Sequence, residues 1–172
     1  GPVINAIGVM TIGCETMGNL QYDFAAYPEH FGDELAILLS MLSRISTEHY
    51  MLGARARAAL RRRVAELYHD VDLLMLPTTE DTACTYPHSL DRTPILDPTA
   101  TAGVTRFNFL ANLTGLPAGT VPAGEKHGLP IGIQFVGDAW DEASVIAAMA
   151  HCERLGVHDS LPRPDRFVQL LD

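Results

Sequence analysis

The side chains that could act as nucleophiles are scattered along the chain. Covalent hydrolysis needs a nucleophile beside a base, held on a turn or glycine-rich loop that also supplies oxyanion donors. The six serines are Ser40, Ser43, Ser46, Ser89, Ser144 and Ser160. None of them has a G-x-S-x-G context, no two are adjacent, and the chain contains no Gly-Gly step. We therefore predict no catalytic serine in this sequence.

The seven histidines and three cysteines show no metal-binding spacing. Neither H-E-x-x-H nor C-x-x-C occurs, and Cys14, Cys84 and Cys152 lie far apart, which argues against both a zinc site and a disulfide framework. A cysteine hydrolase built on Cys84, or on Cys152 with His158, is an alternative. The apolar helix face around Cys152 favours a packed structural cysteine instead. We predict no metal and no cofactor.

Three helices are predicted in the first part of the chain. The first, over residues 3–17, is apolar nearly all round, which is typical of a helix inside a larger body. The second is capped by Asp33 and ends near Ser46. The third starts at Ser46 or Thr47 and runs toward His69, and its arginine run indicates a solvated face.

The middle of the chain predicts a strand, a loop and a helix. Residues 71–76 are short and apolar and are stopped by Pro77, as expected of a buried strand. Residues 81–101 carry three prolines and indicate a long irregular loop, of a kind that is often functional. A helix over residues 106–113 ends at a Gly-Leu-Pro sequence.

A β-hairpin follows. Strands at 120–121 and 131–136 flank a glycine-bounded turn at 124–128, which places Lys126, the only lysine, at a solvent-facing tip. Asp141 is predicted to cap a final helix, which ends at Gly156.

Length, composition and charge indicate a single soluble α/β domain over residues 1–172. Residues Gly1-Pro2 are alternatively not native and were left by protease cleavage of an expressed protein. Apolar residues make up 47% of the chain and charged residues 19%, which predicts a packed core. A net charge of -9 argues against nucleic-acid binding. No apolar run approaches the roughly 20 residues of a membrane helix. We expect a cytoplasmic protein, and a homo-oligomer remains open.

Three segments of the chain resemble the C-terminal half of the amidase signature hydrolases, in the order found in that family. They are DLLMLPTT (72–79), FNFLANLTGLPAGTVPAG (107–124) and GLPIGIQFVGDAWDEASVIAAMAHCE (128–153). The resemblance implies an α/β fold, the C-terminal portion of the amidase signature fold, with a mixed β-sheet flanked by helices. The hairpin is then scaffold whose glycines and prolines permit close packing beside the active site.

The same resemblance implies a hydrolase that cleaves carbon-nitrogen bonds of a small-molecule amide. The catalytic serine, its serine partner and the basic lysine belong to the N-terminal half of the family, and this sequence contains neither their loop nor their strand. Lys126 cannot replace the base, because an exposed turn does not lower its pKa. We expect a C-terminal fragment that is inactive alone and whose partner is the N-terminal half of the parent amidase. The alternative is a stand-alone non-catalytic subunit or a degenerate binding module.

Substrate-binding residues are also implied by the resemblance. Arg57 matches an arginine that receives the substrate carboxylate in the tRNA amidotransferase subunits, a task that suits a two-pronged guanidinium, although a solvated arginine is the alternative. Those subunits hold the substrate amino group with an aspartate where this chain has Thr105, so a simple carboxylate or a neutral amide fits better. Further pocket candidates are Thr78, Thr79, Phe107 and Asn108, for which core packing or capping is the alternative.

Overall fold

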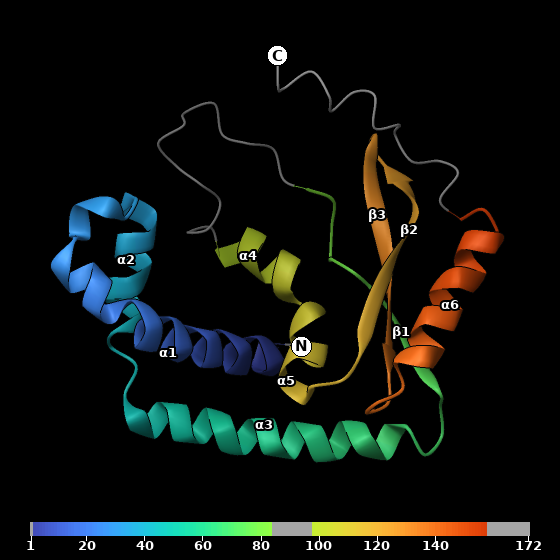
Figure 1. The fold of residues 1–172 in the computed structure, drawn as a ribbon, viewed down its shortest axis with the longest axis horizontal. Coiled ribbons are helices and arrows are strands. Elements are labelled where there is room, and N and C mark those ends of the chain that lie inside the picture. Colours follow the sequence, from blue (N-terminus) through green and yellow to red (C-terminus); the bar gives the residue numbers. More distant parts are fainter. Residues whose placement is uncertain (1, 84–97, 158–172) are drawn as a thin grey trace.

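The computed structural model describes residues 2–83 and 98–157 (Figure 1). Predictions that fall on 84–97 and 158–172 lie outside the described residues. These include Cys84, His158 and most of the expected loop.

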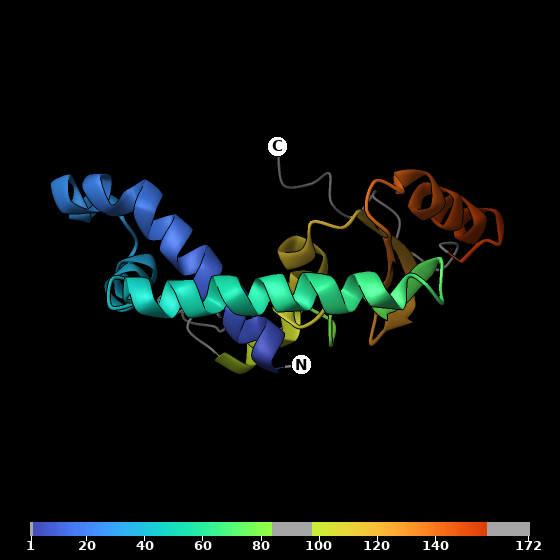
Figure 2. The same ribbon diagram turned by 90° about the horizontal axis from the view of Figure 1, so that it is seen from below.

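The N-terminal part is helical. It comprises α1 (Pro2–Ala26), a short 3-10 helix, η1 (Pro28–His30), α2 (Asp33–Leu42) and α3 (Thr47–Leu67). Helix α1 crosses α3 obliquely (Figure 2). The predicted start of α3 is confirmed, and the structure adds its cap: the Ser46 hydroxyl accepts the main-chain N–H of His49 at 3.2 Å.

Two predictions for these helices are wrong in detail. Helix α1 continues past residue 17 to Ala26, because an interior glycine such as Gly18 only weakens a helix, whereas Pro28 disfavours helical geometry at the residue before it. Asp33 is the first residue of α2 rather than its cap, which is Gly32. The carboxylate of Asp33 thus lies in the first turn, where it suits the helix dipole.

The sheet has the order β1-β3-β2 and is antiparallel throughout. Its strands are β1 (Leu73–Pro77), β2 (Ala118–Lys126) and β3 (Leu129–Gly137). The predicted strand after α3 exists, but it lies at an edge, so Met75 is 66% exposed rather than buried.

The hairpin is confirmed, with a tighter turn than predicted. Lys126 pairs with Leu129, so the turn consists of His127 and Gly128, both with positive φ, at 56° and 77°. The strand register shifts between Pro122 and Glu125, because proline has no N–H to donate to the ladder. Lys126 is therefore the last residue of β2, beside the tip rather than on it.

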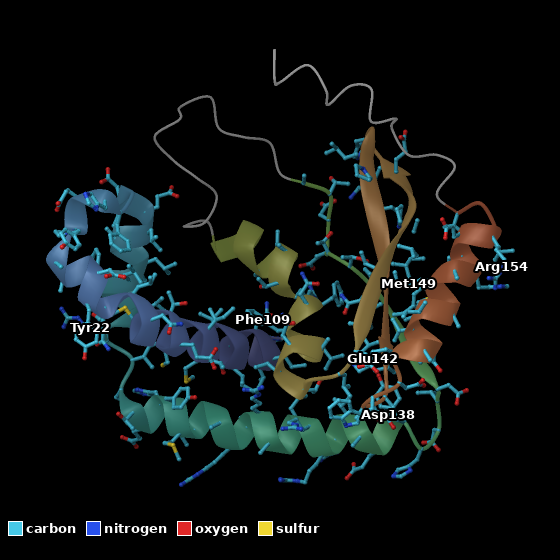
Figure 3. All side chains as sticks on the ribbon, in the orientation of Figure 1. Tyr22, Phe109, Asp138, Glu142, Met149 and Arg154 are labelled. Atoms are coloured by element: carbon cyan, nitrogen blue, oxygen red, sulfur yellow. The ribbon has the colours of Figure 1, made fainter. Side chains whose placement is uncertain are left out.

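Helix α6 (Glu142–Arg154) covers one face of the sheet (Figure 3). On this face, Val145 packs against Val121 and Phe135. Its predicted cap is confirmed, since Asp141 accepts the N–H of Ser144 at 3.2 Å. Gly156, with φ 71°, follows the last turn, as predicted.

Helices α4 (Pro98–Thr105) and α5 (Asn108–Thr114) join the helical part to the sheet. The existence of α4 corrects the prediction that residues up to 101 form an irregular loop; its proline occupies the first helical position, which tolerates the missing N–H. In α5, Phe109 and Leu113 form a second core with Ile7 of α1. A Cβ on Gly8 would lie 2.4 Å from the Phe109 ring, so this approach requires glycine.

Candidate functional site

Polar side chains collect on the sheet face that α6 does not cover. Val121 and Phe135 face α6, so their neighbours Thr120 and Gln134 point to the opposite face. These two residues lie directly across from each other in the β2–β3 ladder. Thr78 joins them at the end of β1, where its N–H donates to the Gly132 carbonyl at 3.0 Å.

The hydroxyls of Thr78 and Thr120 are in hydrogen-bond contact beside Gly132. A Cβ on Gly132 would lie 2.7 Å from Thr78 Oγ1 and 3.4 Å from Thr120 Oγ1. The glycine of the G-L-P-I-G-I-Q motif is thus required because two side chains occupy the space above it.

Asn108 connects α5 to this group. Its Nδ2 donates to the Val104 carbonyl at 2.8 Å, and its Oδ1 accepts from Gln134 Nε2 at 3.2 Å. The carbonyl fixes which end of the Asn108 amide is nitrogen, and this in turn fixes the orientation of Gln134. We call Thr78, Asn108, Thr120 and Gln134 the polar cluster.

Thr79 and Phe107 lie beside the polar cluster and do not join its hydrogen bonds. Thr79 Oγ1 donates to the Asp81 carbonyl at 2.8 Å and thereby closes a local turn. Phe107 precedes α5 and lies under the Arg106 guanidinium, whose carbon is 5.8 Å from the ring centroid. Arg106 also forms an ion pair with Glu80.

Arg57 lies away from the polar cluster, on α3. Its Nε donates to the carbonyl oxygen of Leu113, in the last turn of α5, at 2.7 Å. Helix C-termini leave such carbonyls without intrahelical partners. Arg57 is half-buried, whereas Arg55 is exposed. The structure therefore separates Arg57 from the solvated arginine face of α3.

Lys126 forms an ion pair with Asp81, with 2.7 Å between Nζ and Oδ1. The hydrogen bond from Lys126, followed by that from the Thr82 N–H, lowers the pKa of Asp81 below its ordinary value of 3.8. Both side chains are largely exposed. The pair ties the segment after β1 to the hairpin.

One serine–histidine hydrogen bond is present in the described part of the chain, between Ser46 Oγ and His49 Nδ1 at 2.8 Å. The same serine caps α3, so the histidine occupies the position that glutamate takes in a capping box. The pair is exposed, and we assign it a structural role.

Residues 2–83 and 98–157 contain no group of three or more His, Cys, Asp or Glu side chains that could hold a metal ion. Within the same ranges, no helix is both long and apolar enough to cross a membrane.

Sequence reasoning missed Thr120, Gln134 and Gly132. A glutamine inside the apolar strand IGIQFVG was the available signal, because a polar side chain in such a strand needs a hydrogen-bond partner. Its partner Asn108 lies 26 positions away in the sequence, which a local pattern cannot show.

Relatives of known sequence cover most of this chain, whereas the chain covers only part of them. It is 31% identical over 166 residues to a fatty acid amide hydrolase from Oryza sativa subsp. japonica, spanning 95% of this chain and 27% of the relative. It is 36% identical over 143 residues to a glutamyl-tRNA(Gln) amidotransferase subunit from Halobacterium salinarum, spanning 80% and 33%.

Solved structures show the same fold. A bacterial aryl acylamidase of the amidase signature family superposes with a TM-score of 0.67 at 22% identity, covering 88% of this chain and 33% of that one. A chain from an inhibitor-bound vestigial protein complex, described as revealing the evolutionary origins of an s-triazine catabolic enzyme, gives a TM-score of 0.72 at 20% identity, with 89% and 34% coverage. The Amidase family model matches residues 9–146. This chain belongs to the amidase family.

Proposed function

We propose that the chain is the scaffold and substrate-pocket part of a hydrolase that cleaves carbon-nitrogen bonds of small-molecule amides, and that it is inactive alone. The supporting observation is the polar cluster, in which family motifs from three parts of the sequence meet. Thr78 comes from the LPTT motif, Asn108 from the segment that opens α5, and Gln134 from the G-L-P-I-G-I-Q strand. Polar groups that converge from distant elements are typical of ligand sites.

The reaction that fits the family is acyl transfer through a serine of the N-terminal half. The serine oxygen would attack the amide carbon, the carbon-nitrogen bond would break, and the amine would leave with a proton. Water would then release the acyl group as an acid. The residues described above would bind and orient the amide.

Arg57 is our proposed receptor for a substrate carboxylate. Because Leu113 occupies Nε, a carboxylate would bind end-on to the two terminal nitrogens, while the carbonyl bond holds the guanidinium plane in place. The motif resemblance implies that Thr105 takes the position of an aspartate in the tRNA amidotransferase subunits. We therefore favour a neutral amide, or an amide that carries a carboxylate but no amino group, over an amino-acid amide.

The proposed partner is the N-terminal half of the parent amidase. The apolar surface of α1 supports this, because Val3 and Ile12 are 69% and 54% exposed. A helix with such side chains on several faces is normally covered.

Amide hydrolysis by the chain, with and without a coexpressed N-terminal half, tests the proposal. We expect hydrolysis at the buffer rate for the chain alone and turnover for the pair. Turnover by the chain alone would contradict the proposed inactivity. If the complete parent protein also fails to hydrolyse amides, the alternative of a non-catalytic binding module is favoured.

A further inference from the structure

Helix α2 carries apolar side chains on two opposite faces, and only one of them is covered. Leu39 has no exposed surface, and Leu42 lies against Gly13 of α1, where an added Cβ would be 2.4 Å from its side chain. On the opposite face, Ile37 and Met41 are 49% and 63% exposed. A helix that is apolar on opposite sides is normally buried on both. Because α2 lies at the end of the helical part that is farthest from the sheet, a second molecule can reach this face (Figure 1).

The uncovered side of α2 forms an open groove whose lining residues all belong to this helix and the turn after it. Ser40, at the middle of the groove, donates its hydroxyl proton to the Ala36 carbonyl at 2.8 Å, so its hydrogen-bond donor is satisfied within the helix. Asp33 lies four positions before Ile37 and therefore shares its side of the helix. We define the α2 face as Asp33, Ala36, Ile37, Ser40, Met41 and Arg44.

The α2 face matches itself about a point between positions 38 and 39. An antiparallel second α2, related by a two-fold axis at that point, places Asp33 opposite Arg44, Ala36 opposite Met41, and Ile37 opposite Ser40. Each pair joins either two opposite charges or one large and one small side chain, which lets two helices approach closely. A two-fold interface requires a surface that is complementary to itself. A surface that binds an unrelated partner has no such requirement, so the pattern favours a second copy of this chain.

The two charges of the α2 face have no ion-pair partner in their own protomer. Asp33 and Arg44 are both exposed, and neither forms a salt bridge within residues 2–83 and 98–157. They lie roughly 16 Å apart along the helix axis, too far to pair with each other. The net charge of -9 disfavours unspecific association of two copies. Opposite charges at both ends of the α2 face would offset this repulsion at one register only.

We propose that two copies of this chain dimerise through the α2 face, with the two α2 helices antiparallel about a two-fold axis. The proposal is independent of the proposed function, because it involves neither a substrate nor the N-terminal half. One helix face is smaller than the area of about 1,200 Å² at which stable interfaces begin. The dimer is therefore weak, and we expect a dissociation constant of about 10–500 µM.

Sedimentation equilibrium of the 172-residue chain over this concentration range, at low salt, tests the proposal. Ile37→Glu should weaken the dimer at least about tenfold, because it places an unpaired carboxylate at the centre of the interface. Ile12→Glu is the matched control. Ile12 is 54% exposed on α1, so the same substitution there should leave the dimer unchanged. Circular dichroism checks that both variants keep their helices.

Charge reversal tests the antiparallel register and does not depend on the apolar residues. Asp33→Arg and Arg44→Asp should each weaken the dimer at least about tenfold, because like charges then meet at both ends of the interface. An equimolar mixture of the two variants should dimerise like the wild type, since opposite charges again face each other at both ends. The double variant should also recover the wild-type affinity, for the same reason.

A chain that stays monomeric throughout this range overturns the proposal. So does equal dissociation by Ile12→Glu and Ile37→Glu, which would assign the association to α1, or a mixture of the charge variants that associates no better than either variant alone. If the chain is monomeric and Ile37→Glu instead abolishes its binding to the coexpressed N-terminal half, the α2 face belongs to that partner.

Discussion

The Nε of Arg57, on α3, donates a hydrogen bond to the main-chain carbonyl of Leu113 in the last turn of α5, across 2.7 Å. We predict that Arg57→Ala lowers the free energy of unfolding of the chain by about 1.5–3 kcal/mol, as expected for a hydrogen bond to a charged group. Denaturant unfolding measures this. Arg55→Ala is the matched control and should behave like the wild type, since Arg55 is exposed two positions away.

The same arginine gives a prediction about the substrates of the proposed parent amidase. If Arg57 receives a carboxylate, Arg57→Ala should cost about 2–4 kcal/mol in kcat/KM with acidic amides and little with neutral amides of the same shape. Arg57→Lys should also lose activity with acidic amides, because an ammonium cannot replace the guanidinium fork. Equal losses on both substrate types would show that Arg57 only joins α3 to α5.

Gly132 should not tolerate a side chain. We predict that Gly132→Ala destabilises the chain by about 1–3 kcal/mol, because the new Cβ would displace the Thr78 hydroxyl from Thr120. Thermal unfolding provides the measurement. Gly18→Ala is the opposite control, since nothing lies within 4 Å of its Cβ position and alanine favours the helix. A Gly132→Ala variant as stable as the wild type would mean that the Thr78 and Thr120 hydroxyls are not in contact beside Gly132.

Tyr68 should make the free energy of unfolding depend on pH in the alkaline range. Its hydroxyl donates to the Val136 carbonyl at 2.9 Å, and burial, with a smaller effect of Asp138, raises its pKa from 10.0 to about 12. A raised pKa in the folded state means that the tyrosine stabilises the fold below pH 10 and that this contribution is lost as pH rises toward about 12.

We therefore expect the unfolding free energy of the wild type to fall between pH 10 and 12 more steeply than that of Tyr68→Phe. At neutral pH the variant should be less stable by about 0.5–1.5 kcal/mol, the value of one hydrogen bond. Tyr22→Phe, at a residue that is 78% exposed, is the control. Identical pH profiles for the wild type and Tyr68→Phe would contradict the prediction.

Lys126 should affect the pKa of Asp81 and should not affect catalysis. In Lys126→Ala, the pKa of Asp81 should return toward its ordinary value in an NMR titration, because its hydrogen bond and charge partner is gone. The wild-type pair stabilises the fold above the unfolded pKa of Asp81, and that contribution is lost as pH falls through the lower folded pKa. In the parent, kcat and KM should stay within about twofold. A loss of about 10²-fold or more would indicate a general base.

Local sequence signals predicted the elements with strong boundaries. The sequence predicts Ser46 or Thr47 as a helix start, Asp141 as a cap, and Gly115 and Gly156 as helix ends, because each of these signals acts within a few residues of itself. The family assignment was also predicted from motifs and is confirmed. Asp33 was misplaced by one position, since a carboxylate is favourable both as a cap and in the first turn.

The features of the fold and of the candidate site that the sequence did not predict depend on contacts between residues that are distant in the sequence. Helix α4 was missed because its composition is that of a proline-rich loop, and the edge position of β1 depends on which strand pairs with it. The hydrogen bond between Asn108 and Gln134 likewise requires α5 to lie against the sheet. Arg57 could not be distinguished from its neighbours until Leu113 was placed beside it.

We propose that this chain supplies the scaffold and pocket of an amidase and not its nucleophile. The most direct measurement is intact-mass spectrometry after treatment with a serine-directed fluorophosphonate. The 172-residue chain should gain no adduct, whereas the intact parent should gain one, on a serine outside this chain. A stoichiometric adduct on the chain alone would show that the chain carries its own reactive nucleophile.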